Sequence, residues 1–271
     1  MNNYEKLEGM VAATFTPMDE NGDVNLSVID KYADWIASTP IKGVFVCGTT
    51  GEFSSLTIDE RKLILEKWLV SARKRFKVIA HVGSNCQRSA MELARHAAQV
   101  GADAIASIAP SFFKPGTVDE LVDFFAPICH SAAGLPFYYY NMPSITGVNL
   151  PVDKFLVEGK KKIPNLVGTK FTHNNLMEMG VCIELEQHRF EVLHGYDEIL
   201  ISGLAMGAVA GVGSTYNYIP NVYQAIFDSM KMNDLETARH NQIKSIRTVE
   251  VIIKYGGGVR GGKAIMKLIG I

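Results

Sequence analysis

Short apolar runs alternate with amphipathic stretches eight times along this chain, and the alternation restricts the folds available to it. Each of the first seven runs is followed by a segment with helical spacing of apolar residues, such as 58–74 or 88–100. Such alternation predicts parallel strands joined by right-handed crossovers. The eight runs span residues 10–15, 43–47, 78–82, 104–108, 135–140, 166–171, 190–194 and 208–212.

Eight strand–helix units in 271 residues are typical of a (β/α)8 TIM barrel, here with additional C-terminal helices. We expect a single domain over 1–271, with the barrel at about 9–219 and the C-terminal helices at about 220–271. The runner-up is a doubly wound open sheet, which usually has a glycine-rich phosphate loop after its first strand. Here that turn reads Thr14-Phe15-Thr16-Pro17, without glycine.

Within the C-terminal part we expect helices at 221–232 and 235–255 and a shorter one from Lys263. The segment Gly257–Lys263 fits a nucleotide-binding loop in spacing, but Ala264 replaces the Ser or Thr that would hold Mg²⁺. The segment also follows a helix rather than a strand. We therefore do not expect nucleotide binding there.

The charge balance gives no sign of a nucleic-acid or anionic-membrane partner, because the net charge is −1 and the isoelectric point is about 6.7. No apolar stretch reaches the roughly 20 residues of a membrane-spanning helix. The first six residues have no signal-peptide pattern. The four cysteines are scattered, so we expect neither disulfides nor a zinc site. We expect a cytoplasmic protein that uses no metal and no cofactor.

Lys170 closes the apolar run 165–171, where a lysine is unusual. Burial would lower the pKa of its ammonium group and make a neutral amine available near pH 7. A neutral amine can attack a carbonyl and form a Schiff base. The alternative is a strand-end lysine that snorkels to water. Lys114 is the competing lysine at the same barrel face, in a loop beside Pro115.

The other strand–helix junctions collect polar residues and glycines at the barrel face where active sites lie. Gly48-Thr49-Thr50-Gly51-Glu52 offers hydroxyls and backbone N–H groups that suit a carboxylate, or it only caps a helix. Tyr140 is either a proton-transfer group or part of the core. Asp197 and Glu198 bind sugar hydroxyls or simply start a helix. His81 has no partner at metal-ligand spacing, so we interpret it as a core histidine.

Together these junctions resemble the N-acetylneuraminate lyase and dihydrodipicolinate synthase superfamily of class I aldolases, over about 9–269. The segments that carry the resemblance are Gly-Thr-Thr-Gly-Glu (48–52), Tyr-Asn-Met-Pro (140–143), Gly-Thr-Lys (168–170) and Gly-Val-Gly-Ser-Thr-Tyr-Asn (211–217). The resemblance implies a Schiff base between Lys170 and a 2-oxo acid, and proton transfer by Tyr140. It also implies that Thr49 and Thr50 bind the substrate carboxylate, and that the assembly is a homotetramer.

The resemblance favours the lyase branch. The synthase branch usually carries an arginine where this chain has Ile145, and a tyrosine where it has Phe112. The sugar-tail contacts of the lyase branch fall on five residues. They are Thr172, Gly195, Asp197, Glu198 and Ser214. Superfamily members usually continue for some tens of residues beyond the position of Ile271.

The implied reaction is reversible cleavage of N-acetylneuraminate (sialic acid) to N-acetylmannosamine and pyruvate. Another pyruvate-dependent class I aldolase or dehydratase of 2-oxo sugar acids would use the same core. The dihydrodipicolinate synthase reaction is disfavoured by Ile145. A catalytically silent barrel that acts as a scaffold or binding protein is an alternative of a different class. The presence of four residues argues against it, because silent relatives typically lose the lysine: Lys170, Tyr140, Thr49 and Thr50.

Overall fold

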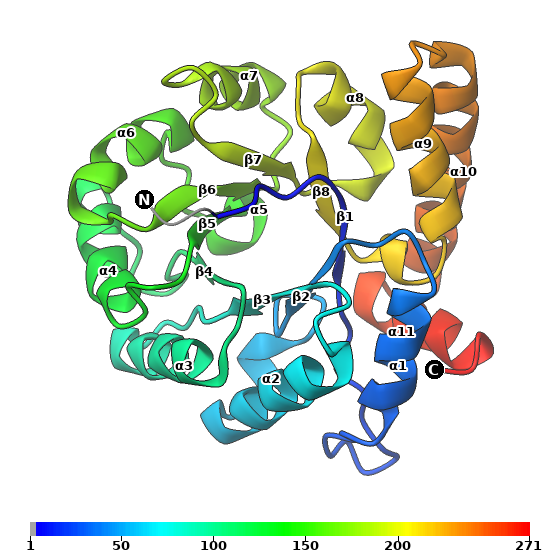
Figure 1. Cartoon of the computed structure of the whole chain (residues 1–271), viewed down its shortest axis with the longest axis horizontal. Helices are drawn as coiled ribbons and strands as arrows, with labels where there is room; N and C mark the ends of the chain where they lie inside the picture. Colours follow the sequence, from blue (N-terminus) through cyan, green and yellow to red (C-terminus); the bar gives the residue numbers. More distant parts are fainter. Residues whose placement is uncertain (1–3) are drawn as a thin grey trace.

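A computed structural model describes residues 4–271, and in it eight parallel strands close into a barrel in chain order (Figure 1). Strand β1 pairs with both β2 and β8, which closes the ring. The TIM-barrel prediction is therefore confirmed. The strands are β1 (Gly9–Ala13), β2 (Gly43–Val46), β3 (Lys77–His81), β4 (Ala104–Ile108), β5 (Phe137–Asn141), β6 (Leu166–Phe171), β7 (Glu191–His194) and β8 (Ala210–Gly213).

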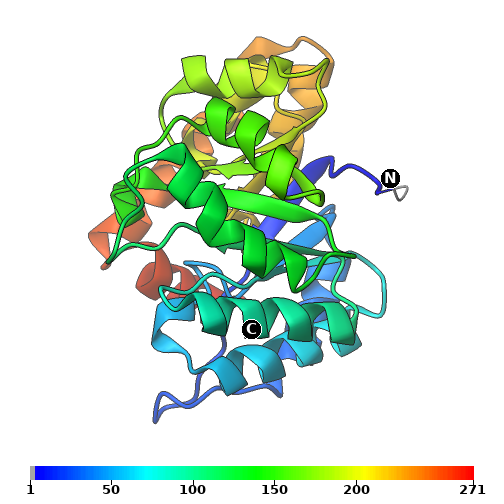
Figure 2. The same cartoon turned by 90° about the vertical axis from the view of Figure 1, so that its left-hand side faces the viewer.

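Helices surround the barrel and cover the outer face of its strands (Figures 1 and 2). The α-helices are α1 (Val28–Ala37), α2 (Ile58–Ala72), α3 (Gln87–Val100), α4 (Val118–His130), α5 (Pro143–Thr146), α6 (Val152–Lys162), α7 (Leu176–Glu184), α8 (Leu200–Ala205), α9 (Pro220–Lys231), α10 (Leu235–Lys254) and α11 (Gly258–Leu268). Three 3-10 turns lie at the carboxyl ends of strands: η1 (Phe53–Ser55), η2 (Asp197–Ile199) and η3 (Thr215–Asn217).

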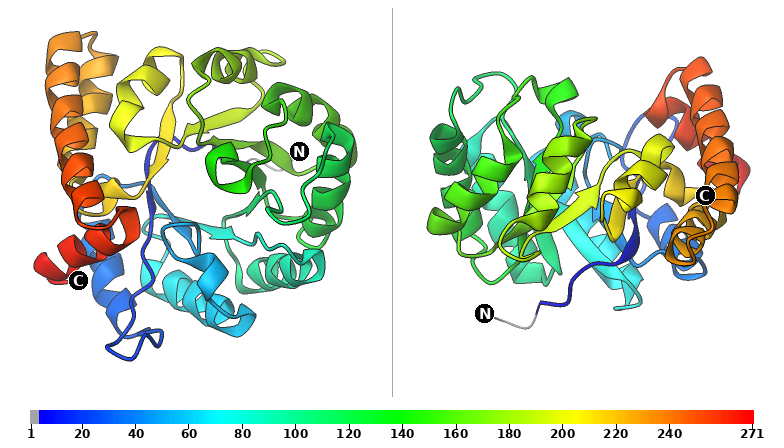
Figure 3. Two further views of the ribbon diagram at one scale, coloured as in Figure 1. Left: turned by 180° about the vertical axis from the view of Figure 1, so that it is seen from behind. Right: turned by 90° about the horizontal axis from the view of Figure 1, so that it is seen from above.

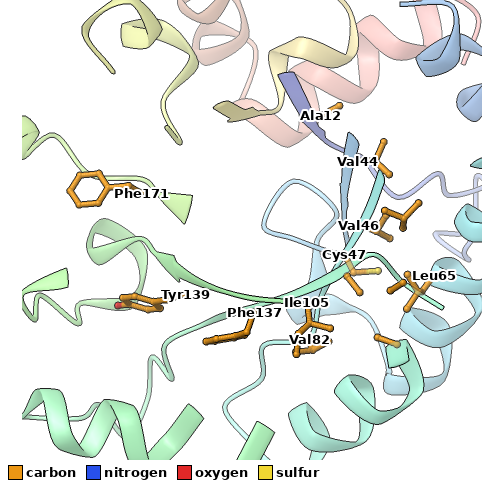
Figure 4. Close-up of a cluster of buried hydrophobic side chains, with 14 of the residues drawn as sticks. Ala12, Val44, Val46, Cys47, Leu65, Val82, Ile105, Phe137, Tyr139 and Phe171 are labelled. Atoms are coloured by element: carbon orange, nitrogen blue, oxygen red, sulfur yellow. The ribbon is translucent and has the colours of Figure 1, made fainter. Parts of the chain in front are cut away.

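The strands separate two apolar layers, because successive side chains of a strand point to opposite faces. Outward-facing residues pack against the helices, as Figure 4 shows for Val46 of β2 near Leu65 of α2. Inward-facing residues fill the barrel itself. The buried members of this inner layer are Leu7, Val11, Ala13, Phe45, Ile79, Ala104, Ala106, Ile108, Tyr138, Tyr140, Leu193, Ala210 and Val212.

The C-terminal helices differ from the sequence expectation at one boundary. Helix α11 begins at Gly258, five residues before the predicted start at Lys263. Three glycines lower the helix propensity of this segment, but close packing requires two of them. A Cβ at Gly262 would overlap the ring of Phe15, and one at Gly261 would lie 2.8 Å from the Ile252 side chain. Because the whole segment is helical, it is not a nucleotide-binding loop.

Helices α9 and α10 lie side by side along one flank of the barrel, and α11 continues from them (Figure 3). Lys263 of α11 reaches Glu52 at the mouth of the barrel, with 2.5 Å between Nζ and Oε1. The C-terminal helices are thus linked to the turn that follows β2. None of the helices within residues 4–271 combines the length and the apolar character needed to cross a membrane.

Candidate active site

Lys170 projects from β6 into the barrel, and its side chain is buried with 4 % exposure. Its Nζ lies 4.1 Å from the centre of the Tyr140 ring and 4.5 Å from that of Phe45. In the described part of the chain, no carboxylate lies within ion-pair distance of this amine. The alternative of a lysine that reaches out to water is therefore wrong, since aromatic rings surround the amine.

Tyr140 of β5 is the register partner of Lys170 on the neighbouring strand and is also buried. Its hydroxyl lies 3.2 Å from Oγ1 of Thr49 and 3.1 Å from Sδ of Met142. The ring packs edge-on against Phe45 and His81. Tyr140 thus belongs to the inner layer of the barrel, and its hydroxyl lies beside Thr49 at the same mouth as Lys170, a placement that suits either a packing role or a proton-transfer role.

The turn after β2 presents Thr49 and Thr50, both half-buried, at the barrel mouth. It begins at Cys47 and ends at Glu52, both of which have a left-handed backbone, with φ of 54° and 58°. Oγ1 of Thr16 donates to the carbonyl of Gly51 at 2.8 Å. The pair between Glu52 and Lys263 holds the other end. The turn is therefore fixed from several sides, which suits it to bind a small anion through hydroxyls and backbone N–H groups.

His81 supports the same turn from inside the barrel. Its Nδ1 lies 2.8 Å from the carbonyl oxygen of Cys47, so the ring donates there in its neutral form. Burial, aided by the nearby charge of Arg61, lowers the pKa of His81 well below its usual value of 6.5. Arg61 in turn donates to the carbonyl oxygens of His81 and Gly83. The core-histidine interpretation is thus correct in burial, and the residue also positions a candidate binding turn.

Thr172 and Gly195 meet at the ends of β6 and β7. Thr172 is buried, and within residues 4–271 its Oγ1 has no hydrogen-bond partner. A Cβ on Gly195 would overlap that Oγ1, so glycine is required at this position. A buried hydroxyl without a partner costs free energy unless a ligand or water satisfies it. This pair is therefore a candidate contact for a polar substrate group.

Asp197 is buried in the strand-seven loop, and its Oδ2 accepts two hydrogen bonds from Thr215. They come from the backbone N at 2.8 Å and from Oγ1 at 2.6 Å. Among the described residues, none donates to Oδ1. Burial raises the pKa of Asp197 to about 6, against the lowering effect of the Thr215 hydrogen bonds. Glu198 and Ser214 are half-buried on the same two loops. The five predicted sugar-tail residues thus gather at the ends of β6, β7 and β8.

The sequence analysis did not predict two contacts of the site, one with an aromatic ring and one with a sulfur atom. Phe45 lies under the Lys170 amine, and Met142 lies against the Tyr140 hydroxyl. Strand alternation could have indicated Phe45, because it is an inward-facing residue of β2, the strand that precedes the 48–52 turn. The competing Lys114 is exposed, with its side chain lying across Gly147.

Within residues 4–271, no group of three or more His, Cys, Asp or Glu side chains is arranged to hold a metal ion.

Comparison with known proteins agrees with this geometry. The N-acetylneuraminate lyase of Mus musculus is 43 % identical over 268 residues, which cover 98 % of this chain and 84 % of that protein. The structure of Proteus mirabilis N-acetylneuraminate lyase superimposes with a TM-score of 0.96 at 37 % identity, over 98 % of this chain and 90 % of the other.

The structure of the N-acetylneuraminate lyase (sialic acid aldolase) from Aliivibrio salmonicida gives a TM-score of 0.95 at 38 % identity, over 97 % of this chain and 87 % of the other. The profile of the Dihydrodipicolinate synthetase family matches residues 6–271, nearly the whole chain. The predicted superfamily is confirmed by these similarities, and this chain belongs to the Dihydrodipicolinate synthetase family.

Proposed function

We propose that this chain catalyses the reversible cleavage of N-acetylneuraminate to N-acetylmannosamine and pyruvate through a Schiff base on Lys170. The observation that carries the proposal is the buried amine of Lys170, 4.1 Å from the centre of the Tyr140 ring. An amine held in this way can attack a carbonyl carbon. The similarity to sialic acid lyases over nearly the whole chain supports the choice of substrate.

The first half of the reaction forms the covalent intermediate. Thr49 and Thr50, with backbone N–H groups of their turn, bind the carboxylate of the open-chain sugar acid. The lone pair on Nζ of Lys170 adds to the C2 ketone, and loss of water gives an iminium ion. The iminium is an electron sink beside C3, so the C3–C4 bond can break without a metal ion.

The second half breaks that bond. The substrate carboxylate, to which the Tyr140 hydroxyl donates a hydrogen bond, takes the proton of the C4 hydroxyl as C4 becomes an aldehyde. The electron pair of the C3–C4 bond moves into the iminium and gives an enamine. The Tyr140 hydroxyl gives its proton to C3 and regains one from the protonated carboxylate, which restores the iminium. Water then hydrolyses the iminium to pyruvate and the free amine of Lys170.

The sugar tail occupies the loops after β6, β7 and β8 in this proposal. Thr172 offers a buried hydroxyl without a protein partner, and Oδ1 of Asp197 and the carboxylate of Glu198 offer acceptors. Ser214 and the backbone of Gly195 complete the contacts. A buried acceptor that binds a hydroxyl discriminates strongly against substrates that lack it.

We also propose that the chain folds as one domain and works in the cytoplasm as a homotetramer. The loop at 110–115 carries Phe112 and Phe113, which are 77 % and 86 % exposed, and Ile145 on α5 is 62 % exposed. In a tetramer this loop would pack against a neighbouring subunit. Light scattering tests the assembly, and a fully active monomer would contradict it.

Borohydride trapping tests the chemistry. Incubation with pyruvate and borohydride should add one reduced adduct per chain, mapped by mass spectrometry to Lys170. Lys170→Ala should abolish the adduct and turnover, while the control Lys114→Ala should keep both. An adduct at Lys114 would contradict the assignment to Lys170, and no adduct at all would contradict the Schiff base and favour a silent scaffold. Turnover should persist in excess EDTA, because the iminium takes the role of a Lewis-acid metal.

A substrate panel then separates the enzymes that share this core. Sialic acid should be cleaved faster than other 2-oxo sugar acids. A preference for another 2-oxo sugar acid would assign the chain to a related aldolase or dehydratase.

A further inference from the structure

A ring of hydrogen-bonded oxygens behind the strand-seven loop joins Asp197 to the C-terminal helices. Oδ2 of Asp197 accepts from Oγ1 of Thr215, which lies 2.5 Å from the phenol oxygen of Tyr223. That phenol lies 2.6 Å from Oγ of Ser245 on α10. Ser245 closes the ring, since its Oγ lies 3.3 Å from the carbonyl oxygen of Asp197. All four residues are buried, so water does not compete inside the ring.

Counting protons in this ring shows that it distinguishes the two charge states of Asp197. The ring has four oxygen–oxygen contacts but only three hydroxyl protons, from Thr215, Tyr223 and Ser245. With Asp197 ionised, one contact brings two oxygens together without a proton between them. With Asp197 protonated on Oδ2, every contact has one proton, and all four can be made head to tail.

Helix α10 also holds the loop at a second point. Nε2 of Gln242 donates to the carbonyl oxygen of Asp197 at 3.0 Å, and its Oε1 accepts from the backbone N of Ile201 at 2.9 Å. The carbonyl of Asp197 therefore keeps a donor in either charge state. The charge state of Asp197 therefore changes the hydroxyl ring and leaves this second point of attachment intact.

We infer that Tyr223 and Ser245 are positioning residues for the substrate tail: through this ring they hold Asp197 and set the pH below which its carboxylate no longer accepts a sugar hydroxyl. The inference rests on the proposed function, because it takes Oδ1 of Asp197 as a contact of the polyol tail. Neither residue touches the reacting atoms. Both act on substrate binding through the carboxyl group that they orient.

The groups that face Asp197 are consistent with such a role. Burial is the largest cause of the raised pKa of Asp197, and the charge of Glu198 adds to it, while the Thr215 hydrogen bonds and the charge of Lys170 across the mouth lower the pKa. The phenols of Tyr216, Tyr218 and Tyr223 lie in the field of the same carboxylate. Their pKa values are raised by burial, so they stay neutral and able to donate. The pKa of Asp197, about 6, places its own titration at mildly acid pH.

The test compares two pH profiles, one for sialic acid cleavage and one for pyruvate trapping at Lys170. Trapping needs no sugar tail, so the difference between the profiles reports on tail binding. In the wild-type enzyme the KM for sialic acid should rise below about pH 6, as Asp197 protonates. Tyr223→Phe breaks the ring and removes its preference for protonated Asp197. The acid limb of the profile, the pH range in which the KM rises, should then move to lower pH by roughly 0.5 to 1 unit. This is the scale of one net hydrogen bond.

Ser245→Ala breaks the ring at another point and should move the limb in the same direction, whereas Ser245→Thr keeps the hydroxyl and should restore the wild-type limb. Tyr139→Phe is the matched control, because Tyr139 is a buried tyrosine on the outer face of β5, away from the ring. Its acid limb should match that of the wild type. Pyruvate trapping should be unchanged in every variant.

Three results would overturn the inference. The limb could stay in place in both Tyr223→Phe and Ser245→Ala, it could move equally in the Tyr139→Phe control, or trapping could fall in parallel with cleavage. The last result would mean that the ring only supports the fold. If the wild-type chain forms no adduct or does not cleave sialic acid, the proposed function fails instead, before any variant is compared.

Discussion

The phenol of Tyr140 and the hydroxyl of Thr49 face each other across the barrel mouth, 3.2 Å apart. The two residues lie 91 positions apart in the chain, and the closed barrel brings their strands to the same end. The contact joins a candidate proton-transfer group to a candidate carboxylate-binding group. A substrate carboxylate bound by Thr49 would therefore lie beside the Tyr140 hydroxyl, as the proposed proton relay requires.

Tyr140→Phe should slow sialic acid cleavage by roughly 10²- to 10⁴-fold, the usual cost of losing a positioned proton-transfer group. Pyruvate trapping at Lys170 should change much less, because the substitution leaves the attacking amine of Lys170 in place. Steady-state kinetics and adduct mass spectrometry measure the two effects. Tyr139→Phe is the control from the adjacent, outward-facing position. Near-wild-type turnover of Tyr140→Phe would mean that the residue only packs.

Gly195→Ala should impair cleavage by more than tenfold, because the new methyl group would overlap Oγ1 of Thr172. Overpacking at a rigid position usually costs about 1–3 kcal/mol, and here it displaces a candidate substrate contact. The double variant Gly195→Ala with Thr172→Ala removes the overlap with Oγ1, but the new Cβ still lies 2.8 Å from Cβ of Thr172 and 2.9 Å from the carbonyl oxygen of Phe171. It should regain part of the lost thermal stability in a calorimetric scan but not sialic acid affinity, since the hydroxyl of Thr172 is gone. Full recovery of activity would show that Thr172 does not contact the substrate.

The alternation of apolar runs was sufficient to predict the barrel, because each strand of a buried parallel sheet is a continuous apolar segment. The polar junctions after the strands also led to most of the site, since a barrel brings the carboxyl ends of its strands to one face. Lys170 and Tyr140 were accessible in this way. Their contact with Phe45 was not, because the register between strands cannot be counted from one sequence.

The missed features depend on contacts between segments distant in the chain. The start of helix α11 was predicted five residues too late. Glycine has a low helix propensity, but the packing of α11 against Phe15 leaves no room for a side chain at Gly262. The ring through Asp197 and Ser245 joins residues 48 positions apart and could be seen only in three dimensions. Interactions of this kind leave no periodic pattern in the sequence.

Glu191 lies at the start of β7, at the end of the barrel opposite the candidate site, and should make the free energy of unfolding depend on pH. Its Oε2 accepts from the backbone N of Leu7 at 2.8 Å and from the Tyr138 hydroxyl at 3.1 Å. Burial raises the pKa of Glu191 above its usual value of 4.5. A carboxyl whose pKa is higher in the folded state favours folding when protonated. Its contribution is therefore lost as the pH rises from 4.5 through the folded-state pKa.

Glu191→Gln keeps both acceptor contacts but cannot ionise, so it should remove this part of the pH dependence. The free energy of unfolding, measured by urea denaturation, should favour the variant more at pH 7.5 than at pH 4.5. Glu198→Gln serves as the control on a half-buried carboxylate at the opposite end of the barrel. Parallel curves for the wild type and Glu191→Gln would contradict the prediction.

Replacement by alanine should have opposite effects on stability at two glycines of α11, Gly262 and Gly258. Gly262→Ala places a methyl group against the ring of Phe15 and should destabilise the protein by about 1–3 kcal/mol, the usual cost of overpacking. Gly258→Ala meets no atom within 4 Å and should be neutral or stabilising by up to about 1 kcal/mol, because alanine favours a helix over glycine. Urea denaturation of the two variants measures the difference directly.

The same pair also tests whether α11 supports the candidate carboxylate-binding turn. Displacement of α11 by Gly262→Ala should loosen the contact between Lys263 and Glu52, and with it the turn that carries Thr49 and Thr50. The variant should then bind pyruvate more weakly in the trapping assay, whereas Gly258→Ala should not. If both variants trap pyruvate as the wild type does, α11 contributes to stability alone and the turn is held by its own contacts within the barrel.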